Sequence, residues 1–169
     1  MHILGIAGWS GSGKTTLIVA MLPLLRAAGL TVSTVKHAHR GFDLDRAGKD
    51  SFRHREAGAG EVLLIGDRRW ALLVEEREPV LEALLPRLSP CDLLLVEGFK
   101  SHPHRKLEVH RPTLGKPPLW PGRADIVAVA APAPLAHCPV PVLPLDDAAT
   151  VARWIVAGMA DTSPVGDTA

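Results

Sequence analysis

The stretch that decides the fold is Gly8-Trp9-Ser10-Gly11-Ser12-Gly13-Lys14-Thr15. It matches the phosphate-binding pattern G-x-x-x-x-G-K-[ST] at every specified position. The residues before it, 2–7, are apolar like a short buried strand, and residues 14–28 after it show the pattern of a helix closed by Gly29. Because the motif and its strand–loop–helix context agree, this part of the chain is predicted to bind a nucleotide phosphate.

The residue types of this motif each have a physical role. Glycines let backbone N–H groups turn towards phosphate oxygens, and the amino end of the following helix adds partial positive charge. Lys14 is predicted to reach the β- and γ-phosphates, and the Thr15 hydroxyl to hold Mg²⁺. For Trp9, contact with the nucleotide, a place in an interface and simple packing all stay open. The predicted nucleotide-binding residues here are Gly8, Trp9, Ser10, Gly11, Ser12, Gly13, Lys14, Thr15 and Thr16.

Residues 92–97, Asp-Leu-Leu-Leu-Val-Glu, are the clearest buried strand in the chain. In a parallel α/β sheet, ligands bind beyond the carboxyl ends of the strands, so Glu97 is placed near Lys14 and Thr15. Glu97 is therefore predicted to bind Mg²⁺ directly or through water, or to orient an attacking water. Lys14 and Glu97 are the predicted catalytic residues. Asp92 lies at the opposite end of the strand and is interpreted as structural.

A polar stretch, residues 36–46, follows the strand predicted at 31–36 and also starts at the ligand-binding edge. Asp43 or Asp45 is predicted to complete the metal sphere begun by Thr15 and Glu97. Lys36 and His37 are predicted to contact phosphate or a pterin. A transition-metal site is disfavoured, because no carboxylate or cysteine stands at a familiar ligand spacing from the histidines.

The rest of the chain alternates strands with helices, which predicts an α/β fold with a mostly parallel central sheet plus a hairpin. The length of 169 residues is close to one ordinary domain, so residues 1–160 are predicted to form a single nucleotide-binding domain and residues 161–169 a disordered tail. Residues 106–110 alternate like an edge or hairpin strand, and residues 112–122 are expected to form an irregular loop. The other predicted strands are 61–65, 70–75, 126–130 and 140–143, and the other predicted helices are 49–57, 78–88 (which Pro86 is expected to shorten) and 146–159.

Composition excludes several classes of function. With 19 Lys and Arg against 18 Asp and Glu, the formal charge is +1, so no global field draws the protein to nucleic acid or a membrane. The aromatic content of 4% is too low for a base-stacking platform. Cys91 and Cys138 lie far apart in no metal-binding pattern, which excludes a disulfide framework. The start of the chain lacks the features of a signal peptide, so a cytoplasmic location is expected.

Together these residues resemble the molybdopterin-guanine dinucleotide biosynthesis protein B (MobB) family. The resemblance covers about the first 110 residues and rests on four stretches. They are residues 8–17, residues 36–51 with Lys-His-Ala-His and Phe-Asp-Leu-Asp, residues 69–72 with Arg-Trp-Ala-Leu, and residues 92–100 ending Val-Glu-Gly-Phe-Lys. The lysine–histidine stretch and the Val-Glu-Gly-Phe-Lys end make the resemblance specific beyond the glycine-rich motif. Dethiobiotin synthetase is similar in its glycine loop and its Val-Glu-Gly strand.

The resemblance implies a P-loop NTPase-like three-layer fold and a homodimer that binds GTP with Mg²⁺. It implies an adaptor to the MobA-type molybdopterin guanylyltransferase, with slow GTP hydrolysis of its own, and leaves open whether molybdopterin touches this chain. One departure concerns the base: the loop Ala131-Pro132-Ala133-Pro134 offers guanine no side-chain carboxylate, so base selectivity rests on backbone groups or is relaxed. The alternatives are a small-molecule kinase or ATP-dependent ligase using the same loop, and a metallochaperone GTPase.

Overall fold

The structure, a computed structural model, describes residues 1–38, 45–76 and 79–160, which fall into two compact units. Unit 1 combines Met1–His37 with Pro90–Ala169, and unit 2 is Ala38–Ser89. The glycine loop and the predicted hairpin therefore lie in different units, and their assignment to one domain over residues 1–160 stays a prediction. Asp43 and the predicted disordered tail lie outside the described residues.

Unit 1 is built on a six-stranded sheet in the order β2-β5-β1-β6-β7-β8, and every neighbouring pair is parallel. The mostly parallel sheet predicted from the alternating pattern is thus confirmed. Parallel strands end at a common edge, so the segments that follow β1, β2, β5 and β6 all leave the sheet on one side. The strands are β1 (His2–Ala7), β2 (Val32–Lys36), β5 (Leu93–Glu97), β6 (Lys106–Val109), β7 (Ile126–Ala131) and β8 (Val142–Pro144).

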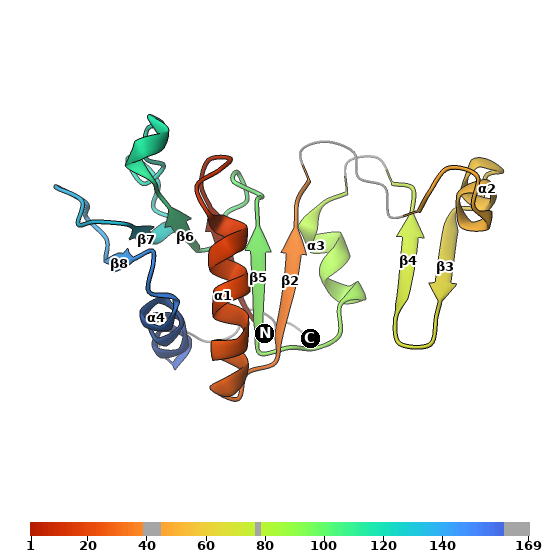
Figure 1. Cartoon of the computed structure of the whole chain (residues 1–169), viewed down its shortest axis with the longest axis horizontal. Coiled ribbons are helices and arrows are strands. Elements are labelled where there is room, and N and C mark those ends of the chain that lie inside the picture. Colours follow the sequence, from red (N-terminus) through yellow and green to blue (C-terminus); the bar gives the residue numbers. More distant parts are fainter. Residues whose placement is uncertain (39–44, 77–78, 161–169) are drawn as a thin grey trace. The chain divides into compact units, whose positions relative to one another are not determined.

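One face of this sheet is covered by α1 (Lys14–Ala27) and α4 (Ala148–Ala160), which lie side by side in Figure 1. Ile6 and Leu95 of the sheet pack with Met21 of α1 and Ile155 of α4 in one buried cluster. Alternate residues of the strands face the other side, where Val129 of β7 belongs to a second, smaller cluster. Burial of both faces explains why β5 reads as a continuous apolar run.

The interpretation of residues 106–110 as an edge or hairpin strand is wrong, because β6 lies inside the sheet between β1 and β7. Its alternation of charged and apolar residues suggested one solvated face. Instead both charged side chains are fully buried and paired. The Lys106 ammonium donates to the carboxylate of Asp125 at 2.7 Å. The Glu108 carboxylate accepts the backbone N–H groups of Leu119 and Trp120 at 2.8 and 2.9 Å.

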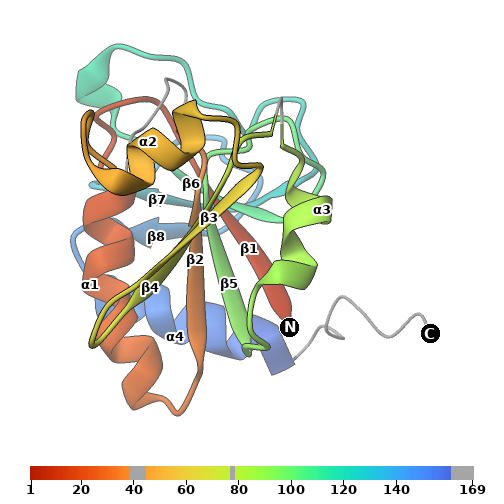
Figure 2. The ribbon, with the colours of Figure 1, turned by 90° about the vertical axis from the view of Figure 1, so that its right-hand side faces the viewer.

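Unit 2 holds an antiparallel hairpin of β3 (Glu61–Ile65) and β4 (Trp70–Val74), whose strands stand side by side in Figure 1 and overlap in the view of Figure 2. It also contains α2 (Asp50–Glu56), α3 (Leu81–Leu84) and the 3₁₀ turn η1 (Leu85–Arg87). The hairpin and α2 agree with the sequence pattern. The helix predicted over 78–88 is shorter, because Pro86 lies in η1 and cannot donate the backbone hydrogen bond of a continuing α-helix. Within the described ranges, no helix combines the length and the apolarity needed to cross a bilayer.

Candidate functional site

The glycine loop, residues 8–13, joins β1 to α1 as the motif predicted. Gly8, Gly11 and Gly13 have φ angles of +143°, +80° and +102°, a region that favours glycine. A Cβ atom on Gly8 would also lie 2.5 Å from the carbonyl oxygen of Val109, too close for any side chain. The motif glycines are therefore required by the backbone of the loop itself.

The loop brings polar groups together around the start of α1. Gly13 caps the helix without a side-chain hydrogen bond, and the first turn carries no acidic residue, so its N–H groups face no carboxylate of their own turn. The ammonium of Lys14 folds back over the loop and donates to the carbonyl oxygen of Trp9 at 2.9 Å. Burial is the main reason why the pKa of Lys14 lies below its usual value; Glu97 opposes this shift, and Lys100 and Lys36 add to it.

Thr15, Glu97 and Lys36 meet at the carboxyl edge of the sheet. The Thr15 hydroxyl donates to Oε1 of Glu97 at 2.8 Å. The Lys36 ammonium lies 3.6 Å from the same carboxylate oxygen and 3.5 Å from the Thr15 hydroxyl. Strand register explains the gathering, since Lys36 pairs with Glu97 across β2 and β5. Three residues that the sequence placed at one site are therefore in contact.

The turn after β5 has the backbone geometry of a tightly constrained site. Gly98 has a φ of +100° and Phe99, which is not a glycine, a φ of +46°. A Cβ on Gly98 would lie 2.9 Å from the Cβ of His37, whose ring stacks on Phe99 at a centroid distance of 4.4 Å. The backbone N–H of His37 donates to the carbonyl oxygen of Glu97 at 2.8 Å. This packing holds the end of β5 against the end of β2 and orients Glu97.

The donor set suits a nucleotide phosphate with Mg²⁺. Thr15 and Glu97 offer hydroxyl and carboxylate oxygens, which are the ligands this ion prefers. The Ser12 hydroxyl, 1% exposed inside the loop, has no hydrogen-bond partner among the described residues. Ser10 and Thr16 are exposed beside it and supply further hydroxyl groups. These features fit a loop that closes around a ligand's oxygen atoms.

Asp45 lies in unit 2, where its nearly buried carboxylate pairs with Arg55 at 3.1 Å. Arg55 also binds Glu75 at 2.7 Å. This network gives Asp45 a stabilising role in its own unit. Its role as a metal ligand, like that of Asp43, stays a prediction.

Sequence reasoning missed the contribution of the segment after β6. Trp9 donates its indole N–H to the carbonyl oxygen of Pro117 at 2.7 Å, and the Lys116 ammonium lies 5.9 Å from the centre of its ring. The Lys100 ammonium lies 4.4 Å from the same ring centre. Recognising 106–109 as an interior parallel strand would have placed the following residues at the ligand edge.

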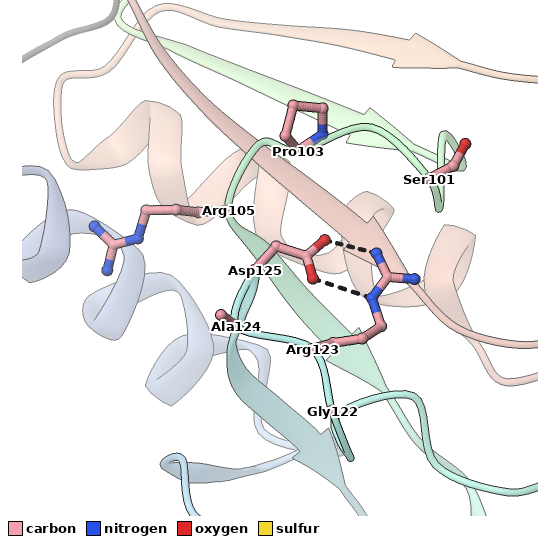
Figure 3. Close-up of a pocket in the computed structure, with 7 residues that line it drawn as sticks. All are labelled: Ser101, Pro103, Arg105, Gly122, Arg123, Ala124 and Asp125. Carbon is pink, nitrogen blue, oxygen red and sulfur yellow. Dashed lines mark hydrogen bonds and ion pairs between the residues drawn. The ribbon is translucent and has the colours of Figure 1, made fainter.

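A surface pocket lies beside the amino-terminal ends of β6 and β7 (Figure 3). Figure 3 shows Arg123 and Asp125 in this pocket turned towards each other, joined by bonds of 3.0 and 2.6 Å. Arg123 is the main reason why the pKa of Asp125 lies far below its usual range. Because these charges neutralise each other, the pocket is a weaker candidate for an anionic ligand than the glycine loop.

The fold and the site define an α/β protein with a six-stranded parallel sheet and a glycine-rich loop between β1 and α1. The family model described as molybdopterin guanine dinucleotide synthesis protein B matches residues 3–132. The chain thus belongs to the MobB family of adapter proteins in molybdopterin-guanine dinucleotide biosynthesis.

Individual relatives and a solved structure agree with this family. The molybdopterin-guanine dinucleotide biosynthesis adapter protein of Escherichia coli is 37% identical over 163 residues, 93% of each chain. The protein of the same name from Haemophilus influenzae is 46% identical over 118 residues, which are 68% of this chain and 66% of the relative. The crystal structure of a MobB protein homolog from Bacillus stearothermophilus has a TM-score of 0.71 at 26% identity, covering 96% of this chain and 100% of that one.

Proposed function

We propose that this chain is a GTP-binding adapter that assists a MobA-type guanylyltransferase in attaching GMP to molybdopterin in the cytoplasm. The observation that carries the proposal is the contact of Thr15 with Glu97 beside Lys36, at the end of a loop that already holds Lys14. Membership of the family indicates the biosynthetic pathway, and this arrangement of side chains suits the binding of phosphate and Mg²⁺.

In this proposal the glycine loop and the amino end of α1 surround the phosphates, and Lys14 leaves the Trp9 carbonyl to bind them. Thr15 and Glu97 would hold Mg²⁺, which neutralises phosphate charge when it is bound. Lys36 and His37 lie at the same edge and contact the anionic ligand. Asp43 and Asp45 remain the candidates for a further ligand, and Asp45 would have to exchange its partner Arg55 for the metal.

Hydrolysis by this site is proposed to be slow. The Glu97 carboxylate accepts the hydrogen bond of the Thr15 hydroxyl and lies beside the Lys36 ammonium, so it is not free to act as a general base. An adapter also needs the bound nucleotide to persist while the partner enzyme acts.

The proposed homodimer rests on the hairpin of unit 2. One face of β3 and β4 carries an exposed apolar set in which Ile65 and Trp70, 79% and 69% exposed, stand directly opposite each other. Leu63 and Leu72 form the next pair on this face. A second copy of the chain offers the same apolar face, so a two-fold axis would bury both at once.

The test is equilibrium binding of GTP and ATP, each with and without Mg²⁺, followed by guanylylation of molybdopterin with the partner enzyme. We expect Mg²⁺-dependent GTP binding and a faster partner reaction when the chain is added. Failure to bind either nucleotide would contradict the proposal. Tighter binding of ATP, with phosphate transfer to a small acceptor, would instead favour a kinase.

A further inference from the structure

The segment 111–117, which follows β6, lies along the glycine loop in antiparallel order. Nη2 of Arg111 lies 3.7 Å from the position that a Cβ on Gly13 would take. Leu114 comes within 3.8 Å of the corresponding position on Gly11. The carbonyl oxygen of Pro117 accepts the indole N–H of Trp9 at 2.7 Å. As the residue numbers of the segment increase, the numbers of the loop residues that it contacts decrease. Arg111 therefore lies at the end of the loop where α1 begins.

Both ends of this segment are anchored in the protein. At its start, the backbone N–H of His110 donates to the carbonyl oxygen of Ala130 at 2.9 Å, which continues the pairing of β6 with β7. Just beyond it, the buried carboxylate of Glu108 accepts the backbone N–H groups of Leu119 and Trp120. The ring of His110 packs edge-on against Trp120. The position of Arg111 is therefore built into the fold before any ligand arrives.

Arg111 is half-buried, yet among the described residues its guanidinium has no hydrogen-bond or ion-pair partner. It stands near the start of α1, at the end of the glycine loop around which the ammonium groups of Lys14, Lys36 and Lys100 also gather. Among the residues that the structure describes, Lys36 is the cation within ion-pair distance of Glu97. A fourth cation added to such a place favours an anion with several negative charges.

We propose that Arg111 is a phosphate-binding residue beside the glycine loop. It would contact the phosphate chain of the nucleotide from the β6 side of β1, whereas Glu97 and Lys36 lie on the side of β5 and β2. The inference rests on the proposed function only in taking a nucleotide as the ligand; the contact itself requires phosphate oxygens and no particular base. A guanidinium can bind two phosphate oxygens at once, which an ammonium at this position cannot do.

The experiment compares Arg111→Ala and Arg111→Lys with Arg26→Ala. This control removes an exposed arginine that lies about 18 Å along α1 from Lys14, the first residue of the helix. Binding of Mg²⁺–GTP and of inorganic tripolyphosphate is measured for each, together with thermal unfolding without ligand. We expect Arg111→Ala to weaken binding of both ligands by about tenfold, Arg111→Lys by about threefold, and Arg26→Ala to change neither. Unfolding temperatures should match the wild type. If Arg111→Ala does not fold, Arg111→Gln takes its place, since it keeps the aliphatic part of the side chain and a polar end without the charge.

Each outcome decides the assignment. Unchanged affinities in a folded Arg111 variant would overturn it, and so would weaker GTP binding with unchanged tripolyphosphate binding, which would place Arg111 at the base or the ribose. Tighter binding of ATP than of GTP by the wild type, with the Arg111 effect intact, would contradict the proposed function and leave this assignment standing. A wild type that binds neither GTP nor tripolyphosphate would overturn both.

Discussion

Replacing Glu97 by glutamine separates metal binding from phosphate binding at this site. The variant keeps the side-chain volume and a carbonyl oxygen that can accept the hydrogen bond from Thr15. It removes the negative charge that Mg²⁺ would contact and that faces Lys36. We therefore expect binding of Mg²⁺–GTP and Mg²⁺-dependent hydrolysis to fall, whereas GTP in EDTA binds as well as before or better, because its phosphates no longer meet a carboxylate.

The effect on folding is expected to be small. The Lys36 ammonium lies 3.6 Å from Oε1 of Glu97; the lysine side chain is 62% exposed and the glutamate side chain 13%. Because the lysine end of the pair is open to water, we use Coulomb's law in water, which at this separation corresponds to about 1 kcal/mol, the upper end of what solvent-exposed pairs contribute. By contrast, loss of one carboxylate from a metal site lowers metal affinity by about tenfold or more. The change in Mg²⁺ dependence should thus exceed any change in stability.

Isothermal titration of GTP in Mg²⁺ and in EDTA measures the two effects in one protein. The matched control is Asp92→Asn, the same chemical change at the amino end of the same strand, where the carboxylate binds Thr31. We expect the control to bind GTP like the wild type under both conditions. The reasoning is refuted if Glu97→Gln retains the wild-type dependence on Mg²⁺, or if it loses GTP binding equally in EDTA.

Three further predictions address the loop, the buried charges and the hairpin. Lys14→Ala should weaken GTP binding at least tenfold, about 1.4 kcal/mol, and normal affinity in a folded variant would contradict the glycine-loop assignment. Asp125→Ala leaves the ammonium of Lys106 buried without its carboxylate and should cost about 3 kcal/mol of unfolding free energy in urea at pH 7. Because the pKa of Asp125 is lowered in the fold, its contribution is present above the carboxyl's unfolded pKa and is lost as the pH falls towards the folded value, so wild type and variant should converge in strong acid. Light scattering at micromolar concentration should give twice the chain mass of 18.1 kDa. Trp70→Lys should lower this mass, and Val19→Lys, at an exposed apolar site on α1, should leave it unchanged; a monomer mass for the wild type would contradict the proposed dimer.

Local patterns in the sequence were enough to predict the centre of the site. The glycine motif needs positive φ angles that only its own glycines supply easily, so pattern and backbone are tied together. Glu97 could be placed near Thr15 because an apolar run ending in a carboxylate indicates a buried parallel strand, and parallel strands share their ligand edge. The hairpin was likewise predictable, since short-range turn chemistry and alternation determine its pairing.

Long-range pairing decided the rest. Lys106 and Glu108 look like the solvated face of an edge strand, but the groups that compensate their buried charges, the Asp125 carboxylate and the backbone N–H groups of Leu119 and Trp120, are 11 to 19 residues away. Once β6 lies inside the sheet, Arg111 and Pro117 reach Gly13 and Trp9, contacts between residues about 100 positions apart that no local periodicity encodes. The sequence alone thus determined the glycine loop and the side chains that we propose to bind phosphate and metal, because the pattern that reveals them is local. The tertiary structure decided which further charges stand beside them, because a buried charge depends on partners that only the completed sheet brings into reach.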